Sequence, residues 1–169
     1  MQNKRATIDA LNACGRAEFV AALGWIFEGS PWVAERAWTQ RPFGGLDELH
    51  RAMVSEVARA SREEQLTLLR AHPDLGTRAR MSHASTGEQA AAGLGGLSRQ
   101  QLEQLDQLNA SYREKFGYPF LLAVKGRTPH QILDALARRL PREPHEEFAE
   151  ALLQVERIAR FRLEEILDS

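Results

Sequence analysis

The last segment of the chain places an arginine where a buried helix face would ordinarily carry a hydrophobic residue. Residues 144–167 have the spacing of one amphipathic helix whose apolar side chains form a single stripe: Phe148, Leu152, Val155, Ile158, Ala159 and Ile166. Arg162 falls inside this stripe, whereas Arg157 and Arg160 face the opposite side. Because an unpaired guanidinium is very costly to bury, we expect Arg162 to be half of a buried ion pair or the anion-binding group of a site.

Helix start signals recur along the rest of the chain. Capping boxes stand at Ser61–Glu64, Ser85–Glu88 and Ser98–Gln101, and Thr128 precedes a proline that suits a first helical position. No hairpin signal, internal repeat or long linker interrupts this pattern. We therefore expect an all-α fold, with residues 1–169 forming a single compact domain of about eight helices. The uneven segment lengths argue against a regular four-helix bundle.

The same signals predict where individual segments begin and end. The expected segments are a helix over 19–27 that ends near Gly29, a short helix capped by Ser30 and running to Trp38, a helix over 46–57, one from Ser61 that ends near His72, a loop over 76–84, a short helix that ends near Gly93 to Gly96, a long helix that ends at Gly117, a buried extended segment over 118–124 and a helix from Thr128 to Leu140.

Composition excludes several classes of protein. The net charge of −1 with dispersed basic residues gives no footprint for nucleic-acid binding. No apolar run approaches the roughly 20 residues of a membrane span, and no apolar stretch typical of a secretory signal follows the first residues. Cys14 is the only cysteine, which excludes an internal disulfide and fits a cytoplasmic location.

His72 is the clearest candidate for chemistry, because Pro73 directly follows it and fixes the direction of the backbone. An imidazole presented from the end of a helix by a rigid turn suits a general acid or base. Alternatively, His72 is a helix C-terminal residue that the helix dipole favours. Local sequence leaves both interpretations open.

Ser85, Glu88 and Gln89 form a second candidate group. A capping box alone explains Ser85 and Glu88. The same helix N-terminus also offers free backbone N–H groups to an anionic or carbonyl oxygen, with Glu88 and Gln89 beside it. The aromatic stretch 116–120 is either core packing or an apolar wall beside backbone amides that bind a planar heterocycle.

The sequence contains no sign of a metal or nucleotide site. The other histidines, His50, His83, His130 and His145, have no partner at the spacing of metal ligands, so we expect no metal. No phosphate-binding loop, dinucleotide fingerprint or nucleophile elbow is present.

Six segments, spread over roughly residues 19–167, form a distinctive set: Phe27-Glu28-Gly29-Ser30-Pro31-Trp32, Arg41-Pro42-Phe43, Ala71-His72-Pro73-Asp74-Leu75, Ser85-x-x-Glu88-Gln89-x-x-x-Gly93-Leu94, Tyr112-x-x-Lys115-Phe116-Gly117-Tyr118-Pro119-Phe120 and Glu156-Arg157-Ile158-x-x-x-Arg162-Leu163. Together, in this order, they resemble one family, the 2-oxo-4-hydroxy-4-carboxy-5-ureidoimidazoline (OHCU) decarboxylases.

This resemblance implies an all-α homodimer that needs no cofactor and releases CO2 from OHCU to form (S)-allantoin in urate breakdown. It implies that His72, Glu88 and Arg162 are catalytic, with His72 as general acid and with Arg162 and Glu88 positioning the substrate. The implied substrate-binding positions are Pro73, Ser85, Thr86, Gly87, Glu88, Gln89, Phe120, Leu121, Leu122, Ala123 and Val124. The chain also ends without a peroxisomal tripeptide, which again favours the cytoplasm.

Three alternatives compete with this prediction. A helical adaptor would need an exposed apolar patch, and a helical DNA-binding domain would need a basic face that a net charge of −1 does not suggest. A different small-molecule lyase on the same scaffold is the nearest alternative, because a fold does not determine a function.

Overall fold

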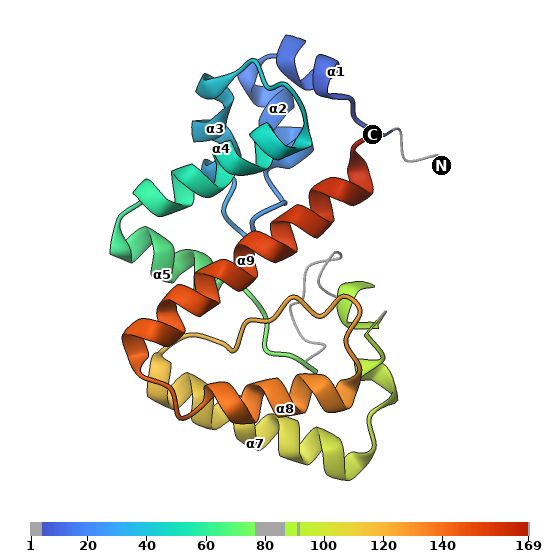
Figure 1. The fold of residues 1–169 in the computed structure, drawn as a ribbon, viewed down its shortest axis with the longest axis vertical. Coiled ribbons are helices and arrows are strands. Elements are labelled where there is room, and N and C mark those ends of the chain that lie inside the picture. The colour runs from blue at the N-terminus through green and yellow to red at the C-terminus, as the bar shows by residue number, and fades with distance from the viewer. Residues whose placement is uncertain (1–4, 77–86, 91, 169) are drawn as a thin grey trace. The chain divides into compact units, whose positions relative to one another are not determined.

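A computed structural model describes residues 5–76, 87–90 and 92–168 and contains helices but no β-strand in these ranges (Figure 1). The α-helices are α1 (Ile8–Ala13), α2 (Arg16–Leu23), α3 (Trp32–Ala37), α4 (Leu46–Arg59), α5 (Arg62–Arg70), α7 (Arg99–Phe116), α8 (Pro129–Arg139) and α9 (Pro144–Ile166), with 3-10 helices at η1 (Trp38–Gln40) and η2 (Leu94–Gly96). Residues 87–90 are also helical. The predicted all-α class is confirmed, and helix lengths from 6 to 23 residues are not those of a regular four-helix bundle.

The described chain groups into two compact units. Unit 1 takes in the chain up to Leu68 and again from Glu156, and unit 2 runs from Leu69 to Val155. The second boundary therefore falls inside α9, whose first half belongs to unit 2 and whose second half belongs to unit 1. That residues 1–169 form one domain stays a prediction.

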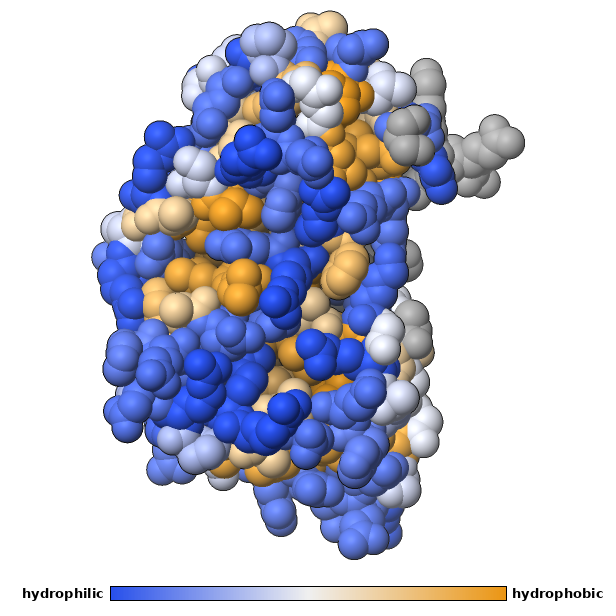
Figure 2. All heavy atoms as spheres, viewed as in Figure 1, coloured by the Kyte–Doolittle hydropathy of each residue, from blue (hydrophilic) through white to orange (hydrophobic). Residues whose placement is uncertain are grey.

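Each unit has its own hydrophobic core. In unit 1, α2, α3 and α4 pack around completely buried side chains, among them Phe19, Leu23, Val33, Leu49 and Met53. In unit 2, α7 packs against α8 and contributes Leu105 and Tyr112, while α8 contributes Ile132 and Leu136. The polar faces turn outward, and hydrophilic residues cover most of the face in Figure 2 with smaller apolar patches between them.

Most predicted helix ends are correct because local capping chemistry sets them. The side chains of Ser61, Ser98 and Thr128 each accept a hydrogen bond from the third residue that follows, as a capping box requires. Gly117 ends α7 in a left-handed conformation with φ 81°. The start of the predicted box at Ser85 lies outside the described residues, as does the predicted loop over 76–84 beyond Gly76.

Near the N-terminus, one helix was not predicted and two predictions were wrong. Helix α1, which Thr7 caps, was not anticipated. The predicted helix over 19–27 ends at Leu23, and residues 24–31 form turns instead. Ser30 does not cap α3, because its hydroxyl donates to the carbonyl of Glu28 and Pro31 stands at the N-cap. These turns carry the hydrogen-bond partners of Arg162.

Candidate active site

His72 lies two residues beyond the end of α5 and is 6% exposed. Its backbone N–H donates to the carbonyl of Leu69 at 3.3 Å, and Pro73 then turns the chain away from the helix direction. The prediction that Pro73 ends this helix is confirmed. His72 is therefore a buried imidazole on a turn at a helix end, the placement from which a side chain can serve as general acid or base.

Two buried side chains from other elements hold the turn that follows His72. The Oε1 atom of Gln89 accepts a hydrogen bond from the N–H of Gly76 at 2.9 Å. The Nδ2 atom of Asn109, on α7, donates to the carbonyl of Leu75 at 2.9 Å. The backbone of the turn is thus bound at both Leu75 and Gly76 by residues distant in the sequence, and these two bonds hold its conformation. Gln89 was predicted to contact a ligand, and here its carbonyl oxygen binds the backbone.

Gly76 occupies a position of this turn that strongly favours glycine. Its φ is 81°, and a Cβ atom would stand 2.7 Å from Cδ2 of Leu105. We expect Gly76→Ala to lower the free energy of unfolding by more than the about 1–2 kcal/mol that a left-handed alanine costs alone. Gly126→Ala is the matched control, since Gly126 has φ 78° and open space. Urea unfolding of both variants checks this, and an equal loss would contradict the crowding by Leu105.

The second predicted group is only partly described. Gly87, Glu88 and Gln89 lie in the helical stretch 87–90, where Glu88 is half-buried and Gln89 is buried. Ser85 and Thr86 lie outside the described residues. A role for the N-terminus of this helix in ligand binding therefore stays a prediction.

The segment 118–124 is buried throughout, as predicted, and has no β-ladder. Side chains from two helices, rather than a neighbouring strand, form hydrogen bonds with its backbone. Nη1 of Arg139, on α8, donates to the carbonyl of Leu121 at 2.6 Å. Oε1 of Gln154, on α9, accepts from the N–H of Ala123 at 3.0 Å. The N–H of Ala123, one of the predicted substrate-binding positions, is therefore already used by the protein.

Leu122 stands between these two anchored groups and is 5% exposed. Within the described part of the chain, neither its backbone N–H nor its C=O has a hydrogen-bond partner. Buried backbone groups are nearly always paired, and an unpaired one costs free energy comparable to a lost hydrogen bond. A buried donor and acceptor on one residue are therefore suited to a polar ligand.

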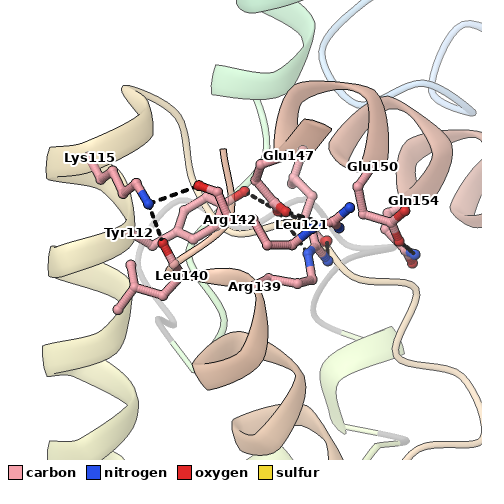
Figure 3. A network of polar contacts seen from close by, with 9 residues as sticks. All are labelled: Tyr112, Lys115, Leu121, Arg139, Leu140, Arg142, Glu147, Glu150 and Gln154. Atoms are coloured by element: carbon pink, nitrogen blue, oxygen red, sulfur yellow. Dashed lines mark hydrogen bonds and ion pairs between the residues drawn. The ribbon is translucent and has the colours of Figure 1, made fainter. Parts of the chain in front are cut away.

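A buried carboxylate, that of Glu147, binds the guanidinium of Arg139 (Figure 3). Glu147, at the start of α9, is completely buried. Its Oε1 accepts hydrogen bonds from Nε of Arg139 at 2.7 Å and from the hydroxyl of Tyr112 at 2.6 Å, and Arg142 lies 3.5 Å from its Oε2. Burial, followed by the hydrogen bond to Glu147, raises the pKa of Tyr112 above its ordinary range, so the hydroxyl stays a donor.

The sequence prediction did not identify Arg139, Glu147 or Gln154 as polar residues of the interior. The sequence holds one signal for two of them. Glu147 directly precedes Phe148, and Gln154 directly precedes Val155, both of which belong to the apolar stripe of the last helix. Such a position lies at the edge of the stripe and gives no indication of which partner a side chain meets.

Arg162 belongs to unit 1 and is 1% exposed, so the prediction that it faces a core is confirmed. Its Nη2 atom donates to Oε2 of Glu28 at 2.8 Å. Its Nη1 atom donates to the carbonyls of Trp25 and Ile26 at 3.1 and 3.3 Å, and the guanidinium lies 5.7 Å from the centroid of the Trp25 ring. The buried ion pair, the first of the two expectations, is present, while anion binding stays a prediction.

Metal and membrane features give no further candidates within the described ranges. No group of three His, Cys, Asp or Glu side chains there is arranged to hold a metal ion. His50, one of the remaining histidines, has its Nε2 atom 2.9 Å from the carbonyl oxygen of Glu156. None of the described helices combines the length and the apolar character that crossing a membrane requires.

Taken unit by unit, these residues include the kinds of groups that an enzyme acting on a small molecule uses for acid–base and electrostatic catalysis. Unit 2 holds a buried imidazole on a rigid turn and a buried backbone donor and acceptor at Leu122. Unit 1 holds a buried guanidinium that three neighbouring oxygens orient. Such groups can bind an anion, polarise a carbonyl and transfer one proton.

Comparison with known proteins identifies the family. Residues 12–164 match the family model for OHCU decarboxylase. The chain is 50% identical over 163 residues to the 2-oxo-4-hydroxy-4-carboxy-5-ureidoimidazoline decarboxylase of Haloferax volcanii, covering 96% of this chain and 97% of that protein. It therefore belongs to the OHCU decarboxylase family, a family of carboxy-lyases, as the sequence resemblance predicted.

Two further relatives extend the comparison to longer proteins. The chain is 48% identical over 161 residues to a uric acid degradation bifunctional protein of Bacillus subtilis, covering 95% of this chain and 33% of that protein. It also superposes on a crystal structure of (S)-allantoin synthase with a TM-score of 0.78 and 34% identity, covering 97% of this chain and 55% of that one. In both relatives, the chain corresponds to only part of the longer polypeptide.

Proposed function

We propose that this enzyme decarboxylates 2-oxo-4-hydroxy-4-carboxy-5-ureidoimidazoline to (S)-allantoin and CO2 in the breakdown of urate. The observation that carries the proposal is 50% identity to a decarboxylase named for this substrate, over nearly the full length of both proteins. The printed names of the other two relatives refer to uric acid degradation and to (S)-allantoin. They point to the same pathway and product.

The reaction needs charge stabilisation and one directed proton. When the bond to the carboxylate breaks, CO2 leaves and the electron pair passes into the π system of the ring. A proton then adds to a ring carbon from one face, which creates the S configuration. We assign this proton to His72, whose burial and rigid turn suit a general acid that must act from one direction.

Arg162 is the proposed anchor for the anionic substrate. A guanidinium binds a carboxylate by charge-assisted hydrogen bonds, and the Glu28 carboxylate and two carbonyls already hold this one in a fixed orientation. Glu88 is proposed to orient His72 or to bind the hydroxyl and ureido groups. Pro73, Gly87, Gln89 and the backbone of 120–124 are the proposed remaining contacts, together with Ser85 and Thr86.

The test is to generate the substrate enzymatically from urate and to follow (S)-allantoin by circular dichroism. We expect the purified protein to accelerate formation of the S enantiomer, whereas the spontaneous reaction gives no enantiomeric excess. A rate equal to spontaneous decay would remove the proposal and favour a different lyase on this scaffold. The same preparation tests the proposed homodimer by light scattering, and cell fractionation tests the proposed cytoplasmic location.

A further inference from the structure

The two peptide units on either side of the Leu122 Cα atom are each anchored at one end only. In a trans peptide unit the C=O and the N–H point in opposite directions. Arg139 binds the carbonyl of Leu121, so the N–H of Leu122 in that unit points away from Arg139. Gln154 binds the N–H of Ala123, so the C=O of Leu122 points away from Gln154. Both polar groups of Leu122 are thus aimed by side chains that bind its neighbours.

Each anchor is itself held by a carboxylate. Arg139 is bound by Glu147, which α9 presents from its first turn. Gln154 is 2% exposed, and its Nε2 atom donates to Oε1 of Glu150, one helical turn earlier, at 2.8 Å. A carboxylate can only accept and a backbone N–H can only donate, so these two neighbours allow one orientation of the Gln154 amide. The anchor at Ala123 therefore depends on Glu150, whose side chain lies beside that of Gln154 in Figure 3.

We propose that Gln154, with Glu150 behind it, is a positioning residue that directs the backbone donor and acceptor of Leu122 at the substrate, with Arg139 serving the other peptide unit. An adjacent N–H and C=O complement the N–H and C=O of a urea or lactam edge, which is the chemistry of a ureidoimidazoline. The inference rests on the proposed function for its substrate. The fixed geometry around Leu122 does not depend on it.

An exchange of the two side chains tests this. Gln154→Glu keeps an acceptor for the N–H of Ala123 but sets a second carboxylate against Glu150, so we expect KM to rise about tenfold, the effect of one displaced hydrogen bond. Adding Glu150→Gln to Gln154→Glu restores a donor between the two positions and should return KM to within about threefold of the wild type. Glu146→Gln, an exposed change in the first turn of the same helix, is the control and should alter nothing.

A second readout distinguishes positioning from simple stability. We expect titration with (S)-allantoin to shift the amide resonance of Leu122 in the wild-type protein and in the double variant, and to shift it less in Gln154→Glu. If Gln154→Glu only lowers the melting temperature while KM and the Leu122 shift stay at wild-type values, the inference is overturned. If Gln154→Glu does not fold, Glu150→Ala replaces it, because loss of the Glu150 acceptor frees the Gln154 amide to rotate.

Failure of the proposed function gives a different result. The wild-type protein would then form no (S)-allantoin above the spontaneous rate, and Leu122 would not respond to this compound. The inference alone fails when the wild type is active and allantoin shifts other resonances of unit 2 but not the Leu122 amide.

Discussion

Replacing His72 by asparagine is expected to lower the turnover number by about 10²–10⁴-fold and to leave the fold intact, because the enzyme loses its proposed general acid. Asparagine keeps a polar side chain of similar reach in this buried position but has no proton to donate near neutral pH. The circular dichroism assay gives the rate, and urea unfolding shows whether the free energy of unfolding is unchanged.

The stereochemistry of the product that this variant forms is a second test of the role of His72. We expect residual product to lose its enantiomeric excess, since water would deliver the proton from either face. His130→Asn is the control, because His130 is exposed in the same unit and should have no effect. A His72→Asn enzyme that is active and fully S-selective would remove His72 from the mechanism.

Removing the carboxylate from the Glu28–Arg162 pair has the largest expected effect on stability. Both side chains are buried, and the bond between them is 2.8 Å long. Glu28→Ala leaves the guanidinium buried without this counter-charge, so we expect the free energy of unfolding to fall by about 3–5 kcal/mol. Urea unfolding at low and high salt measures the loss, which salt should change little because solvent ions do not reach a buried pair.

A double replacement separates the structural role of Arg162 from its proposed catalytic role. Glu28→Met with Arg162→Met removes both charges and fills similar volume, so we expect stability near that of the wild type. Activity should still be lost, because no guanidinium remains to bind the substrate carboxylate. Arg162→Lys keeps the charge but not the planar fork and should also be poorly active. A stable, active double variant would show that Arg162 serves only as an ion pair.

Local sequence predicted those parts of the fold that depend on neighbouring residues. Capping boxes at Ser61 and Ser98 and the stop at Gly117 are contacts over three or four residues, so the pattern contains nearly all the information needed. Helix α1 was missed because six residues are too few to establish a period. The predicted helix over 19–27 includes Ile26 and Phe27 because they continue the helical spacing of apolar residues, whereas burial of both side chains in the core of unit 1 decides the course of this segment.

The same distinction between local sequence and tertiary packing applies to the candidate site. The sequence alone determined that Arg162 must meet an anion and that Pro73 presents His72 from a turn, because both follow from the periodicity of a helix and the stereochemistry of proline. Only the tertiary structure decided that the anion is Glu28, 134 positions away, and that Arg139 and Gln154 bind the backbone on either side of Leu122. These contacts join residues that no local pattern relates, since a buried polar group is satisfied by whichever side chain the packing of the helices brings within hydrogen-bond distance.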